Sequence, residues 1–371
     1  MTAATAHGTG TSGTRDLSWR TGFEIELLAP AGSDRLVLAE RLAATHRGDV
    51  VRSFHTDSEP SPVAGVETFR HLSPAFGVLD ASGAPVARLV DDVTIRADLD
   101  GTGTRGHRGW YRVLSDDGRL LRLVERHADP SAPLASVLDP VAALFGVTVD
   151  VRPGSARVND GAGATVAVAL PLPPGRERPC EVVTPPIVAG HRAALARLLA
   201  PARELGFTVP HEAAVHLHLD AGPFRRPAAF ANVVRLFGWW REHLWTALGT
   251  NTACRRLGPL PAELLDLVSR EPADGPDAWG TLAADARSTG LTKYADVNLT
   301  QVVAADPLRD TLEVRILPGS LDEDAIVRDA ALVEALLRRC LDDDRPLPRP
   351  AAGTPVDVRS ALTDLQDLLR S

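Results

Sequence analysis

The sequence predicts an α+β fold with a mostly antiparallel sheet, and two observations lead to that class. First, strand-like segments follow one another along residues 49–128 without helices between them, whereas a parallel sheet needs a crossover connection for almost every strand. Second, the glycine motifs typical of a dinucleotide-binding fold, at residues 8–13 and 101–106, lack the strand before and the helix after that such a motif requires.

The individual elements follow from hydrophobic periodicity and from the positions of proline and glycine. Residues 19–28 alternate like a strand, and residues 34–46 have helical spacing. Within 49–128 the clearest β segments are 86–99 and 109–125, and we expect the second to be a hairpin that turns at residues 116–118. Further along the chain we expect strands at 163–170, 180–186, 213–220, 296–303 and 311–317, and helices at 132–145, 188–204, 226–249, 259–289, 322–341 and 355–370.

The composition excludes several classes of protein. The formal net charge of −8 over 371 residues argues against a nucleic-acid binder. The three cysteines are far apart and in no CxxC pair, which argues against a disulfide framework or a thiolate zinc site, and Cys180 is expected to be a buried structural cysteine. Residues 1–16 have no signal-peptide core and are expected to be disordered, and no apolar stretch approaches the ~20 residues of a membrane span. We therefore expect a soluble, cytoplasmic, bacterial protein without a nucleic-acid or membrane partner.

Ionisable residues occur in alternating pairs on three of the predicted strands. Glu24 and Glu26 alternate with large apolar residues, so both carboxylates project from one face of the strand while the apolar side chains enter a core. The same pattern pairs His216 with His218 and Glu313 with Arg315, and a further acid, Glu181, begins the strand at 180–186. Strands half-exposed to water are the alternative interpretation, but three such pairs without small polar residues are hard to explain in that way.

If these faces converge, four carboxylates share one cavity. Their mutual repulsion then requires divalent cations or a cationic substrate. Oxygen ligands select Mg²⁺ or Mn²⁺, imidazole is compatible with Mn²⁺, and carboxylate-held Mg²⁺ commonly also coordinates substrate phosphates. Arg315 would be placed to hold a phosphate or a carboxylate.

Three further basic residues are candidates for the same site. Lys293 is the only lysine of the chain, and every other basic residue except histidine is arginine. A single retained ammonium suggests a position where a planar guanidinium does not fit, although chance survival on a loop is the alternative. Arg255 and Arg256 follow the helix predicted at 226–249 and are candidates for a phosphate clamp, with a solvated helix end equally open.

Five motifs occur in a recognisable order over about residues 20–340: G-F-E-I-E-L, E-V-V-T-P-P-I, H-L-H-L-D, K-Y-A-D-V-N-L and L-E-V-R-I-L-P-G-S-L-D. Together they resemble the amidoligase family of the glutamine synthetase and glutamate–cysteine ligase superfamily of carboxylate–amine ligases. The resemblance implies a glutamine synthetase-like antiparallel sheet that forms a funnel flanked by helices. It also implies that ATP, with Mg²⁺ or Mn²⁺, converts a carboxylate into an acyl phosphate, which an amine then attacks to form an amide.

The resemblance and the residue patterns together define a candidate site. Asp92, in the segment V-D-D-V-T-I, resembles the D-x-S-I segment of the family, although Thr94 replaces the usual serine, and it is the expected amine-orienting base. Arg315, Asp92 and Lys293 form the expected catalytic set. Metal binding is assigned to Glu24, Glu26, Glu181, His218 and Glu313, and binding of ATP or phosphate to His216, Arg255, Arg256, Lys293 and Asn298, with the choice between the two histidines as metal ligand left open.

Residues 17–345 are expected to form the catalytic domain, with a β-rich insertion around 55–130, and residues 346–371 to hold a C-terminal helix. Arg70, His71 and Arg96 of the insertion are candidate pocket residues, with surface or ion-pair roles favoured. The partners are a carboxylate and an amine, a peptide being one candidate, and the oligomeric state is open. Two alternatives are a metal-dependent amidohydrolase built on the His216-x-His218 strand and a non-catalytic, ligand-binding relative.

Overall fold

A computed structural model describes residues 16–60, 68–99, 109–270, 277–342, 345–351, 355 and 357–371 of the chain. Both glycine motifs, at 8–13 and 101–106, and all but the last residue of the predicted disordered tail lie outside the described residues. In the described part no helix is both long enough and apolar enough to cross a bilayer.

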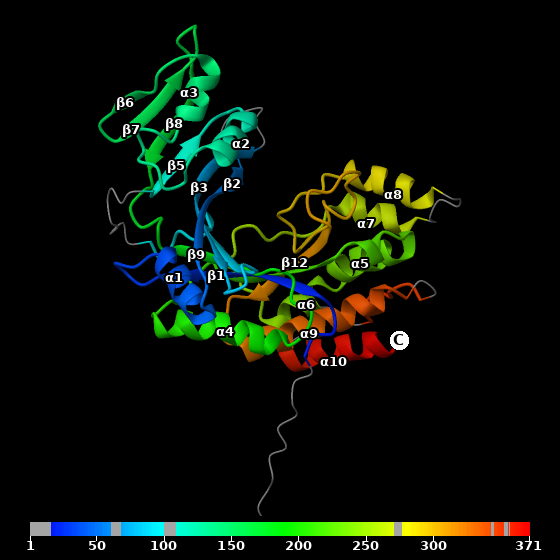
Figure 1. The fold of residues 1–371 in the computed structure, drawn as a ribbon. Coiled ribbons are helices and arrows are strands. Elements are labelled where there is room, and N and C mark those ends of the chain that lie inside the picture. The colour runs from blue at the N-terminus through cyan, green and yellow to red at the C-terminus, as the bar shows by residue number, and fades with distance from the viewer. Residues whose placement is uncertain are drawn as a thin grey trace, which may run out of the picture.

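The centre of the fold is one large antiparallel sheet (Figure 1). Its strands are β1 (Thr21–Leu28), β2 (Val50–Pro60), β3 (Thr68–Leu79), β4 (Pro85–Val90), β5 (Tyr111–Leu114), β6 (Asp150–Arg152), β7 (Ser155–Asn159), β8 (Thr165–Pro171), β9 (Pro179–Val183), β10 (Ala214–Asp220), β11 (Val297–Asn298) and β12 (Thr311–Pro318). Their order in the sheet is β11-β12-β10-β1-β9-β4-β3-β5-β8-β7-β6, and β2 pairs with β3. Every pairing between these strands is antiparallel, which confirms the predicted class.

Helices flank this sheet. They are α1 (Arg35–His46), α2 (Gly118–His127), α3 (Asp139–Phe145), α4 (His191–Glu204), the 3₁₀ turn η1 (Gly222–Phe224), α5 (Pro227–Trp239), α6 (Arg241–Leu248), α7 (Ala262–Ser269), α8 (Ala278–Arg287), α9 (Glu323–Cys340) and α10 (Val358–Arg370). In Figure 1, α4, α9 and α10 lie below the central strands, and α7 and α8 lie to one side. The apolar residues of β1, β10 and β12 pack with these helices in one hydrophobic core.

Hydrogen bonds from helix α9 hold the segment that leads into strand β1. Asp322 caps the N-terminus of the helix, and its carboxylate accepts the backbone N–H groups of Asp324 and Ala325. Further along α9, the buried carboxylate of Glu334 accepts the backbone N–H groups of Ser18 and Trp19, at 3.0 and 3.1 Å. These bonds tie the segment that leads into β1 to the helix layer.

A second hydrophobic core lies at the other end of the sheet. It is built by β5, β7, β8, α2 and α3, with contributions from β2 and β3, and we call β5–β8 with α2 and α3 the satellite unit. Its fully buried residues include Leu72, Val113, Leu138 and Val158. The satellite unit extends the sheet away from the main core (Figure 1).

Two expected β segments are shorter than predicted. The segment 109–125 is not a hairpin: β5 is followed by helix α2, because the Asp117 side chain accepts the backbone N–H of Arg119 and so caps a helix instead of closing a turn. The segment 86–99 is a strand only as far as Val90. There the Asp92 carboxylate accepts the Thr94 N–H at 2.8 Å and bends the chain.

Other boundaries also differ from the predictions. The helix expected at 226–249 is two helices that meet at Trp240, and the one expected at 259–289 contains α7 and α8 as separate helices. The strand expected at 296–303 is only the two residues of β11. Strands β6 and β7 were not predicted, because three and five residues are too few for a periodic pattern to stand out.

Candidate active site

The strand register brings the predicted pairs of ionisable residues onto one face of the sheet. Phe23, Ile25 and Leu27 of β1 are fully buried in the main core, so Glu24 and Glu26 project from the opposite face, as predicted. Pairing across the neighbouring strands then sets Glu24 opposite His216, Glu26 opposite Glu181, His218 opposite Glu313, and Asn298 opposite Glu313. Five strands, β1, β9, β10, β11 and β12, thus contribute to one polar surface.

This surface forms the floor of a cleft of about 430 Å³. Of the predicted site residues the lining includes Glu24, Glu26, Asp92, Glu181, His216, His218, Arg256, Lys293, Asn298, Glu313 and Arg315. Arg255 does not line the cleft: its side chain is 55% exposed and its Nε lies 3.5 Å from a carboxylate oxygen of Glu212. Arg255 thus stands on a turn beyond the end of α6, outside the cleft, and not at a helix end.

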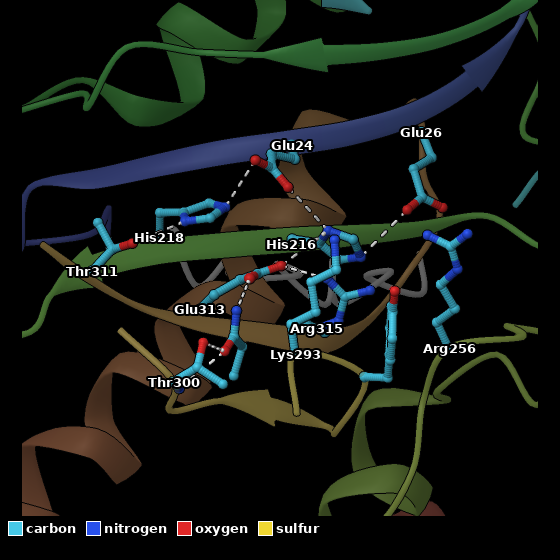
Figure 2. Close-up of polar contacts among 12 residues, drawn as sticks. Glu24, Glu26, His216, His218, Arg256, Lys293, Thr300, Thr311, Glu313 and Arg315 are labelled. Carbon is cyan, nitrogen blue, oxygen red and sulfur yellow. Dashed lines mark hydrogen bonds and ion pairs between the residues drawn. The ribbon is translucent and has the colours of Figure 1, made fainter. Parts of the chain in front are cut away.

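His216 lies among three carboxylates (Figure 2). Its Nδ1 is 3.2 Å from Glu24 Oε2 and 3.6 Å from Glu313 Oε1, and its Nε2 is 3.3 Å from Glu26 Oε1. One ligand atom each from Glu24, His216 and Glu313 lie within 4.8 Å of one another, so a single ion can contact all three. Two carboxylates and one imidazole suit Mg²⁺ or Mn²⁺.

His218 lies beside this group. Its Nε2 is 3.1 Å from Glu24 Oε1, and its Nδ1 is 3.2 Å from the hydroxyl of Thr311. The two histidines therefore hold the two oxygens of Glu24 from different sides. Of the two histidines, His216 belongs to the group of three closely spaced ligand atoms, whereas His218, the predicted metal ligand, contacts Glu24 from the other side.

The four glutamates divide into two electrostatic classes. Burial alone would raise the pKa of Glu24, but His218 and His216 bring it well below its ordinary value. Burial would likewise raise the pKa of Glu313, and the neighbouring Arg315 lowers it. The pKa values of Glu26 and Glu181 are raised well above their ordinary values, first by burial and then by the charges of Asp92 and Glu24, respectively. In this second pair the effect of burial and of the neighbouring carboxylates outweighs that of nearby cations such as Arg315, which lowers the pKa of Glu26.

Several cationic groups surround the floor. Arg315 Nη1 contacts Glu313 Oε1 at 2.5 Å, and Arg309 Nη1 contacts Glu24 Oε1 at 3.2 Å. Between Val314 and Leu317 β12 carries one residue more than β10 opposite it, and such a bulge re-aims a side chain next to a site. Asn298 completes this side by donating to Glu313 Oε2 at 2.8 Å.

Lys293 and Arg256 close over the cleft from its other wall (Figure 2). Lys293 Nζ donates to the hydroxyl of Ser58 at 2.5 Å, and Arg256 Nη1 donates to the carbonyl of Ser58 at 3.2 Å. Both cations lie 5.4 Å from the ring of Tyr294. Burial and the charges of Arg256 and Arg315 lower the pKa of Lys293. The single lysine therefore belongs to the cleft.

Sequence reasoning missed the part of the cleft that β2 supplies. His55 and Asp57 alternate on β2 in the same pattern as the three recognised pairs, and that pattern could have identified them. His55 Nε2 lies 3.7 Å and His71 Nε2 3.5 Å from the two oxygens of Asp57. Arg88 and Arg309 also line the cleft; Arg309 stands on a loop, where no periodicity signals its direction.

Four residues that the sequence left with alternative roles are placed as follows. Arg70 is exposed, whereas His71 is buried against Asp57 and, with Arg96, lines a smaller recess next to the cleft. Cys180 is fully buried in the main core, and burial raises the pKa of its thiol. This agrees with the structural role predicted for that cysteine.

Comparison with known proteins gives one finding of similarity. A family model described as "putative amidoligase enzyme" matches residues 17–337, which is most of the chain and includes every strand and helix that contributes to the cleft. No curated protein matches the chain.

Proposed function

The chain belongs to the amidoligase family, and from this premise we propose that it is an ATP- and Mg²⁺-dependent carboxylate–amine ligase with a glutamine synthetase-like sheet. The observation that carries the proposal is the convergence of Glu24, His216 and Glu313 beside Arg315 on the floor of one cleft. Amide formation from a carboxylate needs such a site, because the carboxylate must first be activated and the activating phosphoryl group carries several negative charges.

The carboxylate residues are the groups that would hold the metal. Glu24, His216 and Glu313 offer ligand atoms close enough for one ion. Glu26 and Glu181, whose pKa values are raised by burial and by neighbouring carboxylates, are suited to a further ion or to the positive end of a substrate. When bound, the divalent cation supplies charge neutralisation to the phosphates of ATP.

The cationic side chains then have separable tasks. Arg315 holds the transferring phosphoryl group, because it stands beside Glu313 at the candidate metal position. Lys293 and Arg256, which close the cleft at Ser58, hold the outer phosphates of ATP. All three cations line the same cleft as the acidic residues, as stabilisation of a phosphoryl transfer requires.

The reaction balances as two substitutions. A carboxylate oxygen of the substrate attacks the γ-phosphorus of ATP and ADP leaves, which gives an acyl phosphate. The amine nitrogen attacks the acyl carbon, phosphate leaves, and the proton lost by the amine passes to the Asp92 carboxylate. Asp92 is buried at the cleft wall, and its two oxygens accept from the backbone N–H and hydroxyl of Thr94, which fixes the carboxylate for this role.

The proposal is tested by phosphate release from ATP. Purified protein with ATP and Mg²⁺ should release phosphate only when both a carboxylate and an amine from a panel of each are present, and chelation of the metal should stop the reaction. Amide hydrolysis without nucleotide would instead support the amidohydrolase built on His216 and His218. Absence of ATP binding in calorimetry would support a non-catalytic relative and would overturn the proposal.

A further inference from the structure

The segment that carries Asp92, residues 91–99, forms neither helix nor strand. Its position beside the sheet therefore depends largely on hydrogen bonds from side chains of other segments. On one side Arg176 holds it: Nη2 contacts Asp91 Oδ1 at 2.5 Å and donates to the carbonyl of Asp92 at 2.8 Å. Nη1 of the same guanidinium donates to the carbonyl of Ile95 at 2.6 Å.

Glu212, in the turn before β10, holds the same segment by a second set of bonds. Its Oε1 accepts the backbone N–H of Ala97 at 2.9 Å and that of Arg96 at 3.4 Å. The residue is only 2% exposed, and a carboxylate that accepts backbone N–H groups makes charge-assisted bonds, which are stronger than neutral ones. In the reverse direction, Asp98 Oδ2 accepts the backbone N–H of His211 at 2.6 Å. The Asp92 segment and the turn are therefore tied to each other at adjacent positions.

The turn that carries Glu212 is itself fixed to the acidic floor of the cleft. The backbone N–H of Ala214 donates to Glu26 Oε2 at 2.8 Å. Asn251 Nδ2 donates to two carbonyls of the turn, at 2.8 and 3.1 Å. One short stretch of chain thus contacts Glu26 through its backbone and the Asp92 segment through the side chain of Glu212, so it sets the position of Asp92 relative to the floor.

Glu212 makes these contacts away from the substrates. It does not belong to the lining of the cleft, whereas Asp92 and Thr94 do. Thr94 and Glu212 together line a separate cavity of about 20 Å³, which has room for about one water molecule and for no organic substrate. Any effect of Glu212 on the reaction therefore acts through the segment that it holds.

We propose that Glu212 is a positioning residue that holds the carboxylate of Asp92 where the amine loses its proton. The inference rests on the proposed function, which assigns Asp92 to that step. In this step the ammonium form of the amine gives a proton to Asp92, the freed nitrogen lone pair attacks the acyl carbon, and phosphate leaves. Loss of the Glu212 carboxylate releases the segment at Arg96 and Ala97 and lets Asp92 shift, while the residues proposed to bind metal and ATP stay in place.

The kinetic test compares two nucleophiles, with the acid that supports phosphate release. A primary alkylamine from the panel is largely protonated at neutral pH and needs a base, whereas hydroxylamine is largely uncharged there and traps an acyl phosphate as a hydroxamate without one. In Glu212→Ala, amide formation with the alkylamine should fall by about 100-fold, while hydroxamate formation and the KM for ATP change by less than about threefold. Glu212→Gln, whose carbonyl oxygen accepts the same N–H groups, should recover most of the rate.

A double-variant cycle shows whether Glu212 acts through Asp92. Asp92→Asn alone should lower amide formation with the alkylamine at least as far as Glu212→Ala does. If the two residues act as one unit, the addition of Glu212→Ala to Asp92→Asn should cause little further loss. Losses that multiply in the double variant would overturn the proposal.

Hydrogen–deuterium exchange measures the tie itself, without turnover. In Glu212→Ala the backbone amides of residues 96 and 97 should exchange faster by about tenfold or more. Glu334→Ala is the matched control, because the buried Glu334 carboxylate also accepts two backbone N–H groups, those of Ser18 and Trp19, but in the segment before β1. This variant should speed exchange at Ser18 and Trp19 and leave the ratio of the two nucleophiles unchanged.

Three further results would overturn the proposal: unchanged exchange at residues 96 and 97 in Glu212→Ala, an equal loss of rate with both nucleophiles, or the same loss of selectivity in Glu334→Ala. A wild-type protein that forms no amide with any acid and amine refutes the ligase, and with it the step assigned to Asp92. Exchange at residues 96 and 97 then still decides whether Glu212 holds the segment, so the two failures are distinguishable.

Discussion

At both ends of the sheet, side chains alternate between the two faces of each strand. At one end the face away from the main core carries buried ionisable groups, and at the other end the alternating residues build a second apolar core. In β1, β10 and β12 the face away from the main core carries Glu24, His216 and Glu313, all nearly buried. In β7 and β8 of the satellite unit, Ala156, Val158 and Ala169 fill a core of their own, while the intervening residues stay partly exposed. Continuity of the sheet therefore does not make a site. A site forms where adjacent strands place ionisable groups opposite one another on the lining of one cleft.

The energetic consequence also differs between the two ends. Ionisation of the buried Glu26 and Glu181 opposes folding, because burial and neighbouring carboxylates raise the pKa values of both, whereas the satellite core only removes apolar surface from water. We thus expect variants of the cleft to change ligand binding more than stability, and variants of the satellite core to do the reverse.

The largest effect is expected for Glu24→Gln. The amide keeps the shape of the side chain but loses the charge that a divalent cation needs, so Mn²⁺ affinity should fall by about 100-fold or more, with phosphate release falling in parallel. Titration calorimetry measures the affinity. Glu204→Gln, an exposed glutamate paired with Arg41 on the outer helices, is the matched control and should bind Mn²⁺ like the wild type. Equal affinity in Glu24→Gln would remove Glu24 from the metal site.

Leu138→Ala should lower stability and leave metal binding unchanged, the opposite of the result expected for Glu24→Gln. Leu138 is fully buried in the satellite core, and its truncation should lower the free energy of unfolding of that unit by about 2–5 kcal/mol. Mn²⁺ affinity at the folded cleft should stay within about twofold of the wild type. Leu144→Ala, on the exposed side of α3, is the matched substitution and should be nearly neutral. A large loss of Mn²⁺ affinity in Leu138→Ala would show that the two ends are one cooperative unit.

Glu181→Gln should stabilise the metal-free protein, and more so at higher pH. Burial and the charge of Glu24 raise the folded-state pKa of Glu181 above its ordinary value of 4.5. The free energy of unfolding of the wild type therefore falls as pH rises above 4.5, because Glu181 ionises more easily in the unfolded chain than in the folded one. The fall levels off once pH exceeds the folded-state pKa. Each unit of elevation corresponds to about 1.4 kcal/mol. Denaturation in EDTA at pH 5 and pH 8 should show the gap between variant and wild type widening; a constant gap would contradict the assignment.

Lys293→Arg keeps the charge but enlarges the head group. The ammonium fits between the hydroxyl of Ser58 and the ring of Tyr294, beside Arg256. A guanidinium is larger and planar and presents its donors differently, so the KM for ATP should rise by about tenfold while the affinity for Mn²⁺ alone stays unchanged. Wild-type kinetics in the variant would mean that Lys293 has no role in ATP binding and survives on its loop by chance.

The smallest effect, and one of opposite sign, is expected for Arg309→Gln. The guanidinium of Arg309 contacts Glu24 where a metal ion would bind, and its side chain is 59% exposed. Removal of a competing cation should raise Mn²⁺ affinity, and exposed ion pairs of this kind limit the gain to about twofold to fivefold. Lower Mn²⁺ affinity in the variant would mean that Arg309 supports the site instead of competing for it.

The acidic face could be predicted because strand alternation is local. Phe23, Ile25 and Leu27 are apolar enough to commit one face of β1 to the core, and Glu24 and Glu26 must then share the other. Where a single side chain redirects the backbone, the prediction failed: the cap at Asp117 converted an expected hairpin into helix α2. A loop residue such as Arg309 gives no periodic signal of its direction.

The sequence by itself determined which residues carry charge and which strand faces they occupy, because the period of a strand is a property of the local chain. Only the tertiary structure decided which of those faces meet. Pairing of β1 with both β9 and β10 put Glu26 beside Glu181 and Glu24 beside His216, which are distant in sequence. Such contacts depend on the register of non-neighbouring strands, which is set by packing of the whole core and not by any one segment.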